Sequence, residues 1–273
     1  MKLAEAMKEK MLLSFELFPP KTEKGMENLP GTIEHLCKYK PEYISCTYGA
    51  GGGNVGANRE VCQMIKKAGP VPVTHFTVIR NTKEGIKEQL DQYLAEGVDH
   101  MLALRGDLPL GETTTCGDFN YATDLVKFVK DQYGDKFEIA VAGSPEGHIA
   151  CRSLEADISV LRQKQDNGAD YIMTQLCWDM EQFKRWLDAI RKAGVTMPVD
   201  VGIMPILDQA ATINMALSRN GCVMDRELSR MISRHWLFPN PFNPKDADGK
   251  PFDMFYDKKV KEFKEEGIEY TIR

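Results

Sequence analysis

The sequence predicts an α/β protein built as a (β/α)8 barrel of the TIM type. Seven apolar runs recur within the first 205 residues at a spacing of roughly 30 residues, the size of one βα unit. An amphipathic stretch separates each run from the next, as expected where helices cover a parallel sheet. The runs are continuously apolar, which is typical of strands buried on both faces. We therefore expect a single barrel domain over residues 1–273, with an irregular insertion at about 235–255.

Each apolar run ends in polar residues of chemical use. The runs, in order, are LLSFELFPP, YISCTYGA, VPVTHFTVI, HMLALRGDLP, EIAVAGSPEGH, YIMTQLCW and VDVGIMPIL. A barrel collects the carboxyl ends of its strands on one face, and barrels of this kind carry their chemistry there. The polar residues at these ends are therefore the candidates for a functional site.

The stretches between the runs carry apolar residues at helical spacing. The N-terminal MKLAEAMKEKM is expected to be a charged helix, and a second helix is expected from Gly31. Asn58 is a candidate N-cap for a helix that buries Val61 and Ile65. The clearest amphipathic stripe begins at Met180. In each helix the apolar face is expected to pack on the sheet.

An eighth strand, which a closed barrel needs, has no convincing candidate. The segment IEYTI near the C-terminus could serve, but it follows directly on the helical pattern of VKEFKEE. We expect the chain to stop inside its last helix. Either the native protein is longer or a partner closes the gap.

Bulk composition excludes several classes of function. The chain is 42% hydrophobic and 27% charged, and its formal charge of −5 is too mild to indicate nucleic-acid binding. Seven cysteines are scattered without a CxxC pair, so no metal or cluster site is expected, and reduced thiols in the cytoplasm are favoured. No apolar run approaches the length of a membrane span, and the N-terminus does not resemble a signal peptide.

Glu16, in SFELFPP, is the first candidate for catalysis. A carboxylate at the end of a buried strand is costly to desolvate. Its apolar neighbours Phe15, Leu17 and Phe18 would raise its pKa and make it a general acid near neutrality. Spacing alone gives equal weight to a structural glutamate paired with an arginine or lysine at the barrel rim.

Three further motifs follow later strands. Asp107 lies two residues after Arg105, and Gly106 between them allows close approach of the backbone; the alternative is a local ion pair that caps the strand. His75 interrupts an apolar strand and, taken alone, is more often a satisfied core histidine than a ligand or base. The glycine-rich residues 49–56 lack the form of a phosphate loop and favour a flexible loop at the strand mouth.

Together these motifs are far more specific than any one of them. The order SFELFPP, CTYGAGG, THFT, ALRGD, SPEGH, DISVLRQKQDNGAD and TQLCWD closely resembles the methylenetetrahydrofolate reductase family in its bacterial catalytic-domain form. The resemblance covers most of residues 11–205. It implies an eight-stranded barrel that binds FAD at the strand ends and reduces 5,10-methylenetetrahydrofolate to 5-methyltetrahydrofolate.

The resemblance also implies roles for individual residues. Glu16 matches the family acid that protonates the leaving nitrogen of the substrate ring, Asp107 matches the carboxylate beside the flavin, and Gln175 matches a glutamine that binds the pterin. The implied FAD contacts are Thr47, Tyr48, Ala50, His75, Arg105, Gly106, Asp107, Tyr121, Ala122, His148, Asp157 and Lys164. No metal ligand is implied. The chain departs from the family pattern at Ser144, Val160 and Gln163, so FAD is expected to be held more weakly than usual.

The electron source is open between two possibilities. Many relatives take hydride from NADH or NADPH, whereas others receive electrons from a partner subunit, for which the apolar, proline-rich residues 236–244 are a candidate docking surface. The family's frequent oligomers imply an oligomer here too. Two other functions remain as alternatives: a flavin-free pterin-binding barrel of the methyl-transfer kind, and a non-catalytic scaffold subunit.

Overall fold

The computed structural model describes residues 2–48, 55–108, 111–217, 222–235 and 256–272. The chain forms two compact units. Unit 1 comprises Met1–Gly143, Ile158–Met173 and Arg191–Asp200, and unit 2 comprises Ser144–Asp157, Thr174–Ile190 and Val201–Arg273. The strands of the sheet lie almost entirely in unit 1.

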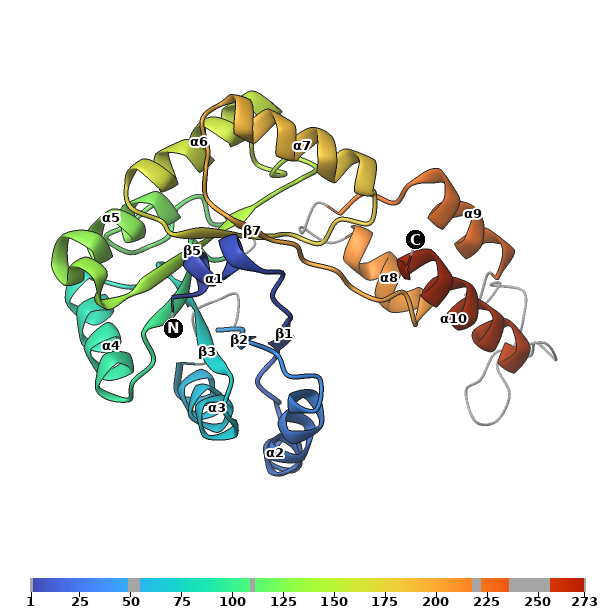
Figure 1. Cartoon of the computed structure of the whole chain (residues 1–273), viewed down its shortest axis with the longest axis horizontal. Helices are drawn as coiled ribbons and strands as arrows, with labels where there is room; N and C mark the ends of the chain where they lie inside the picture. Colours follow the sequence, from blue (N-terminus) through green and yellow to red (C-terminus); the bar gives the residue numbers. More distant parts are fainter. Residues whose placement is uncertain (1, 49–54, 109–110, 218–221, 236–255, 273) are drawn as a thin grey trace. The chain divides into compact units, whose positions relative to one another are not determined.

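Seven strands form one sheet in which the spatial order follows the sequence, as drawn in Figure 1. The registered neighbours are all parallel, with Leu17 opposite Cys46 and Cys46 opposite Thr74. The strands are β1 (Ser14–Leu17), β2 (Tyr43–Cys46), β3 (Val71–Thr77), β4 (His100–Leu104), β5 (Glu138–Gly143), β6 (Tyr171–Thr174) and β7 (Val199–Asp200). This order and direction confirm the predicted barrel class, in an incomplete form.

A contact between distant strands shows that the sheet is curled. The hydroxyl of Tyr43 on β2 donates a 2.6 Å hydrogen bond to Asp200 on β7, and Ser14 on β1 lies 3.4 Å from the same carboxylate. Five strand spacings would separate β2 from β7 by about 24 Å in a flat sheet. The sheet therefore bends so that its last strand approaches its first.

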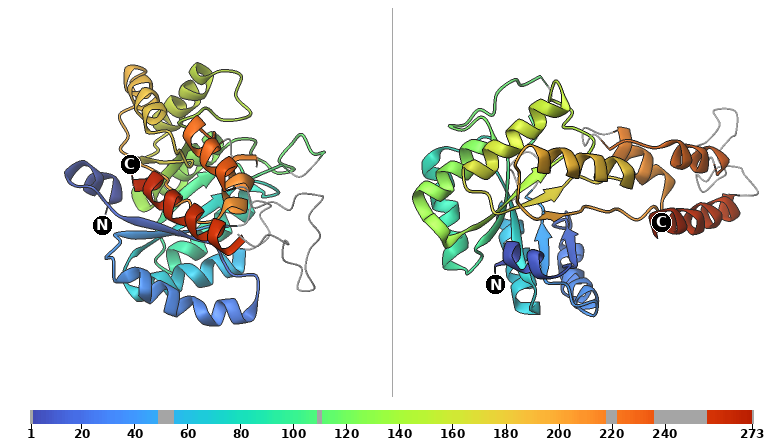
Figure 2. Two further views of the ribbon diagram at one scale, coloured as in Figure 1. Left: turned by 90° about the vertical axis from the view of Figure 1, so that its right-hand side faces the viewer. Right: turned by 45° about the horizontal axis from the view of Figure 1, so that its top comes forward.

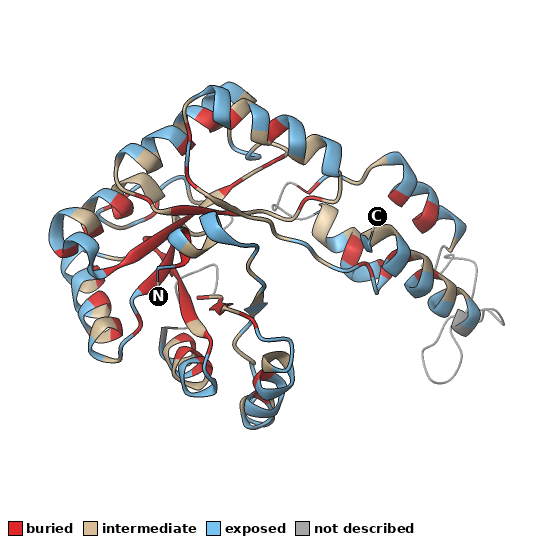
Figure 3. Cartoon of the chain, viewed as in Figure 1, coloured by how far each residue is buried: buried red, intermediate tan, exposed pale blue. Residues whose placement is uncertain are grey.

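Helices alternate with the strands. They are α1 (Leu3–Glu9), α2 (Glu23–Cys37), α3 (Val55–Ala68), α4 (Lys83–Ala95), α5 (Ala122–Tyr133), α6 (Leu154–Asp166), α7 (Met180–Lys192), α8 (Gln209–Leu217), α9 (Arg226–Arg234) and α10 (Tyr256–Ile272), with a short 3-10 turn at Gly134–Lys136. Figure 3 shows buried residues along the strands and on one side of the helices, as an amphipathic stripe requires.

Two predicted helix starts were wrong. The helix expected from Gly31 begins at Glu23, because Thr22 accepts a 3.1 Å hydrogen bond from the Gly25 amide and so caps it, and the helix runs through Pro30. Asn58 does not cap a helix. It lies inside α3, which begins at Val55, and its side chain is fully buried.

The C-terminal segment is helical in unit 2, as expected. The residues IEYTI belong to α10, and no eighth strand occurs in the parts of the chain that the structure describes. Figure 2 shows α9 and α10 side by side, and Leu228, Met231 and Phe263 share a buried apolar cluster with Ile206. The predicted insertion at 235–255 lies, apart from its first residue, outside the described residues.

Disulfides, metal-binding groups and membrane-spanning helices are all absent from the described residues. All seven cysteines are free thiols. Within the described ranges, no group of three or more His, Cys, Asp or Glu side chains is arranged so that it could hold a metal ion. Among the described helices, none combines the length and apolar character needed to cross a bilayer.

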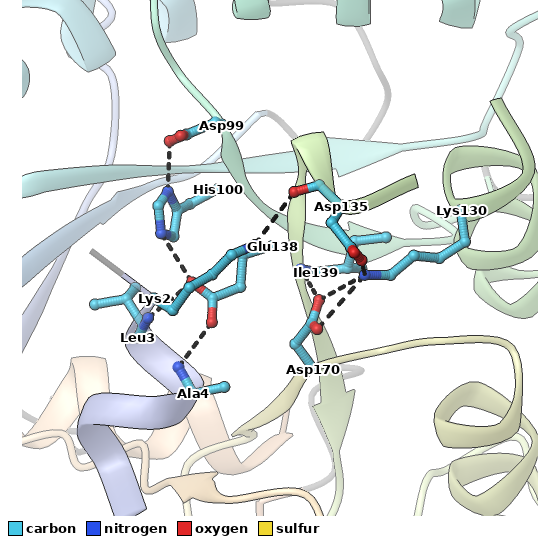
Figure 4. Close-up of polar contacts among 10 residues, drawn as sticks. All are labelled: Lys2, Leu3, Ala4, Asp99, His100, Lys130, Asp135, Glu138, Ile139 and Asp170. Atoms are coloured by element: carbon cyan, nitrogen blue, oxygen red, sulfur yellow. Dashed lines mark hydrogen bonds and ion pairs between the residues drawn. The ribbon is translucent and has the colours of Figure 1, made fainter. Parts of the chain in front are cut away.

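Helix α1 is fixed to the amino-terminal edge of the sheet by a buried carboxylate (Figure 4). Glu138, the first residue of β5, accepts hydrogen bonds from the amides of Leu3 at 2.7 Å and Ala4 at 2.8 Å. His100, the first residue of β4, lies 2.9 Å from the same carboxylate and 2.7 Å from Asp99. Glu138 is therefore bonded at once by a helix terminus and an imidazole.

This cluster predicts a loss of stability at alkaline pH. Burial alone would lower the pKa of His100, but the hydrogen bonds to Asp99 and Glu138 outweigh it and raise that pKa to about 9. A histidine whose folded pKa exceeds its unfolded value stabilises the fold below the unfolded pKa and loses that contribution as pH rises through the folded pKa. We expect the unfolding free energy to fall by up to about 3 kcal/mol from about pH 6 to about pH 10. Urea unfolding across this range measures it. The His100→Gln variant should show a flatter profile, and an equally steep one would refute the assignment.

Candidate active site

The predicted site residues fall into two groups. Ten lie in unit 1, at or after the carboxyl ends of its strands or on its helices: Glu16, Thr47, Tyr48, His75, Arg105, Gly106, Asp107, Tyr121, Ala122 and Lys164. His148, Asp157 and Gln175 lie in unit 2. Ala50 lies outside the described residues.

Strands β1 and β3 bring Glu16 and His75 together. The Glu16 carboxylate lies 3.5 Å from Nε2 of His75. Although 46% of the Glu16 side chain is accessible, enough protein surrounds the carboxyl that burial raises its pKa. Burial also lowers the pKa of His75 to about 4. Both shifts favour the uncharged forms, so this contact differs from the rim ion pair with arginine or lysine that the sequence left open.

His75 is not a satisfied core histidine. Its side chain is almost entirely buried, yet Nε2 has no hydrogen-bond partner among the described residues, and neither does the buried hydroxyl of Thr77 two residues later. A buried polar atom without a partner costs about 1–3 kcal/mol, so such atoms are rare unless a ligand or water meets them. The carboxyl end of β3 thus carries two polar atoms suited to a bound group.

The end of β4 has the backbone geometry that its glycine suggests. Gly106 adopts a φ of +90°, a conformation that side chains disfavour, and a Cβ there would lie 2.9 Å from Ile79. Arg105 donates from Nε to the Gly106 carbonyl at 3.2 Å, and its own carbonyl accepts from the Ile79 amide. Both charged residues of this turn are described, and no ion pair joins Arg105 to Asp107, whose side chain is exposed. The alternative of a local ion pair is therefore wrong.

The Gly106→Ala variant should lose stability. The new methyl group must move Ile79 while the backbone keeps a positive φ, so we expect a loss of about 1–3 kcal/mol. Guanidinium unfolding provides the measurement. Gly111→Ala is a matched control for the backbone term, because it also has a positive φ, +87°, but open space around its Cβ position. Equal losses in the two variants would contradict the proposed contact with Ile79.

Thr47 and Tyr48 follow β2 but differ in their surroundings. The Thr47 amide donates to the Leu17 carbonyl at 2.9 Å, which extends the pairing of β1 with β2 by one residue. Tyr48 is buried, its hydroxyl hydrogen-bonds Gln89 on α4, and its ring packs on Phe76 at a centroid distance of 5.5 Å. The structure therefore places the Tyr48 ring in the core and leaves Thr47 at the strand end.

The other site residues of unit 1 lie on helices. Tyr121 is the N-cap of α5, with its amide bonded to Asp124 at 3.0 Å and its side chain 63% exposed, and Ala122 is the first helical residue. Lys164 on α6 extends its Nζ to the Ala142 carbonyl, 2.9 Å away near the carboxyl end of β5. A cationic group is therefore held close to a strand end.

Unit 2 holds its three candidates in local structures. The His148 amide donates to Asp157 at 3.0 Å, and Nδ1 of His148 accepts from the Ala150 amide at 3.1 Å. The loop that carries His148 borders a hollow of about 370 Å³ extending to Leu154. Gln175 accepts a hydrogen bond from the Leu176 amide at 2.9 Å.

Two polar residues shape unit 1 in ways that the sequence analysis did not predict: Asp200, which is partly buried, and Asn58, which is fully buried. Asp200 bridges β7 to β1 and β2, and burial raises its pKa. Asn58 bonds the end of β2 from inside α3. A carboxylate inside the apolar run VDVGIM was the available signal for Asp200, whereas the helical stripe around Asn58 gave none.

Several known proteins are similar to this chain in sequence. The sequence profile of the family described as "Methylenetetrahydrofolate reductase" matches residues 2–228. The chain is 38% identical over 204 residues to methylenetetrahydrofolate reductase 1 of Schizosaccharomyces pombe, which covers 73% of this chain and 34% of that protein. It is 35% identical over 195 residues to 5,10-methylenetetrahydrofolate reductase of Escherichia coli, covering 71% of this chain and 64% of that protein.

A solved structure supports the fold. A Clostridium thermocellum protein, described as uncharacterized and as binding two copies of 5-methyl-5,6,7,8-tetrahydrofolic acid, superposes with a TM-score of 0.62 at 13% identity, covering all of this chain and 88% of that one. At this identity the likeness concerns the fold alone. The profile match and the relatives at 35–38% identity show that the chain belongs to the methylenetetrahydrofolate reductase family.

Proposed function

We propose that this protein is an oxidoreductase that reduces 5,10-methylenetetrahydrofolate to 5-methyltetrahydrofolate with FAD bound at the strand ends. The observation that carries the proposal is Glu16, a carboxyl with a raised pKa at the end of β1, which lies 3.5 Å from the buried Nε2 of His75, an atom that makes no hydrogen bond among the described residues. Family membership supports the substrate class.

Glu16 would act as the general acid. The substrate's five-membered ring must open before its one-carbon unit can accept hydride, and protonation of the leaving nitrogen lowers that barrier. Because burial raises the pKa of Glu16, more of the protonated acid is present near neutrality than for an ordinary glutamate. Asp107, exposed at the end of β4, would stabilise the cationic iminium that ring opening creates.

The residues of unit 1 fit a flavin on two structural grounds. His75 Nε2 and Thr77 Oγ1 are buried polar atoms that make no hydrogen bond among the described residues, and Gly106 keeps the backbone at the end of β4 free of a side chain. Arg105 and Lys164 supply cations suited to a pyrophosphate. Thr47, Tyr48, Ala50, Tyr121, Ala122, His148 and Asp157 are proposed as further contacts, and Gln175 as a contact to the pterin. When bound and reduced by the electron donor, the flavin would supply hydride to the one-carbon unit and be reoxidised.

NADH or NADPH is the first candidate for the electron donor. A relative from Arabidopsis thaliana, 36% identical over 216 residues, is named as the NADH form of the enzyme. Electron supply by a partner subunit is the second candidate, and residues 236–244, proposed as the docking surface, lie outside the described residues.

An anaerobic flavin assay tests the proposal. The purified protein is supplied with FAD, its visible spectrum is recorded, and NADH or 5-methyltetrahydrofolate is added separately. Bleaching by both supports a reductase that uses nicotinamide directly. Bleaching by the methylfolate alone retains the folate chemistry and assigns electron supply to a partner. Absence of bound flavin would overturn the proposal and favour a methyl-transfer or scaffold role.

A further inference from the structure

Asn58 is the centre of a buried hydrogen-bond network in unit 1. Its side-chain amide donates to the carbonyls of Cys46 at 2.9 Å and Thr47 at 3.1 Å, the last residue of β2 and the first beyond it. Its Oδ1 accepts from the hydroxyls of Thr74 on β3 at 2.8 Å and Tyr93 on α4 at 2.7 Å. One side chain on α3 therefore joins two strands and a neighbouring helix.

The network is fully satisfied at its centre. An asparagine amide has two N–H donors and one oxygen with two lone pairs, and Asn58 uses all of them. The side chain is fully buried, so water does not compete for these bonds. Buried polar networks that are satisfied throughout fix one arrangement of the groups they join, because every alternative leaves a polar group without a partner.

The groups that Asn58 joins lie next to candidate site residues. The Thr47 carbonyl accepts a hydrogen bond from Asn58, and the Thr47 amide donates to the Leu17 carbonyl, which links β2 to the strand that carries Glu16. Thr74 precedes His75, and its hydroxyl lies 3.1 Å from the His75 carbonyl as well as bonding Asn58. One buried amide therefore holds both the residue after β2, which bonds to the strand of Glu16, and the residue before His75.

We propose that Asn58 is a positioning residue that fixes the carboxyl ends of β2 and β3 so that Thr47 and His75 present their polar groups to the bound flavin. The identification of the ligand as a flavin rests on the proposed function. The anchoring of the strand ends by Asn58 is independent of that proposal. Asn58 acts only through these residues and touches no reacting atom.

Three variants separate positioning from simple stability. Asn58→Leu removes the amide at nearly constant size. Tyr93→Phe removes only one bond to Oδ1 and provides a milder variant if Asn58→Leu folds poorly. Val61→Ala is the control, because it removes buried methyl groups from the same helix but no hydrogen bond.

Two measurements on the full chain are needed. The first is amide exchange without flavin, expressed as the rate at Thr47 divided by the rate at Ile139, an amide in β5 bonded to Asp170. This ratio cancels global unfolding, so Val61→Ala should leave it unchanged. The second is the dissociation constant of FAD, measured by quenching of flavin fluorescence.

For Asn58→Leu we expect at least about a tenfold rise in the exchange ratio and at least about tenfold weaker FAD binding, which is 1.4 kcal/mol. Tyr93→Phe should change both in the same direction by less, and Val61→Ala should change neither. If Asn58→Leu and Tyr93→Phe match Val61→Ala in both measurements, Asn58 has only a structural role. If the wild type binds no FAD while Asn58→Leu still selectively speeds exchange at Thr47, the proposed function fails and the anchoring of the strand ends stands.

Discussion

Replacing Glu16 with glutamine is expected to lower turnover of the folate substrate by about 10²–10⁴-fold, the range typical of a lost general acid. Glutamine keeps the size and polarity of the side chain but has no acidic proton to give to the leaving nitrogen. Because the Glu16 side chain is 46% accessible and, among the described residues, accepts no hydrogen bond from a backbone amide, the variant should remain folded. Single-turnover absorbance changes of the flavin with the folate substrate measure the step directly.

Two observations control this result. The variant should bind FAD with a normal spectrum, since glutamine keeps the size and polarity of the side chain that faces His75. Glu27→Gln, at an exposed position on α2, removes a carboxylate elsewhere in unit 1 and should retain full turnover. If Glu16→Gln turns over at the wild-type rate, Glu16 is not the acid, and the scaffold alternative regains support.

Replacing Glu138 with alanine is expected to cost about 3–5 kcal/mol of unfolding free energy, as when one partner of a buried ion pair is removed. The variant leaves the amides of Leu3 and Ala4 without their acceptor and leaves the imidazolium of His100 without its more buried partner. Leu3 and Ala4 pack in the same buried cluster as Tyr43 and Tyr171, so release of α1 also exposes apolar surface. Urea unfolding followed by circular dichroism gives the number.

The matched control for this prediction lies on the other side of the imidazole. Asp99→Asn removes the second carboxylate, whose side chain is 57% exposed, and exposed pairs contribute only about 0–1 kcal/mol. A loss in Glu138→Ala no larger than that in Asp99→Asn would show that α1 is held by its apolar contacts alone.

The architecture was predictable because the spacing of apolar residues along the chain indicates which faces of a strand or helix are buried. Continuous apolar runs mark strands covered on both faces, and the order β1 to β7 follows directly from strict alternation with helices. Glu16 and Gly106 were also accessible from sequence, because an acid among aromatic residues and a glycine between two charged residues each indicate an unusual local environment. The raised pKa and the positive φ agree with those expectations.

The buried polar residues were not predictable, because their partners are distant in the chain. Because asparagine favours helix N-caps, the local pattern predicts a cap at Asn58, yet its partners include Tyr93, 35 residues away on another helix. Glu138 was hidden at the start of an apolar run, and its role depends on helix termini 134 and 135 residues earlier. Local patterns carry no information about such pairings.

The attachment of α1 also has a consequence for the order of folding. Leu3 meets its carboxylate across 135 residues, so during synthesis on the ribosome the first helix has no acceptor until β5 has emerged and paired with β4. Contacts of such long range form late, after the loop between their ends has closed. Helix α1 therefore docks on the sheet after the sheet has assembled and does not nucleate its folding. Nascent fragments that end before β5 should expose α1 to proteases and chaperones.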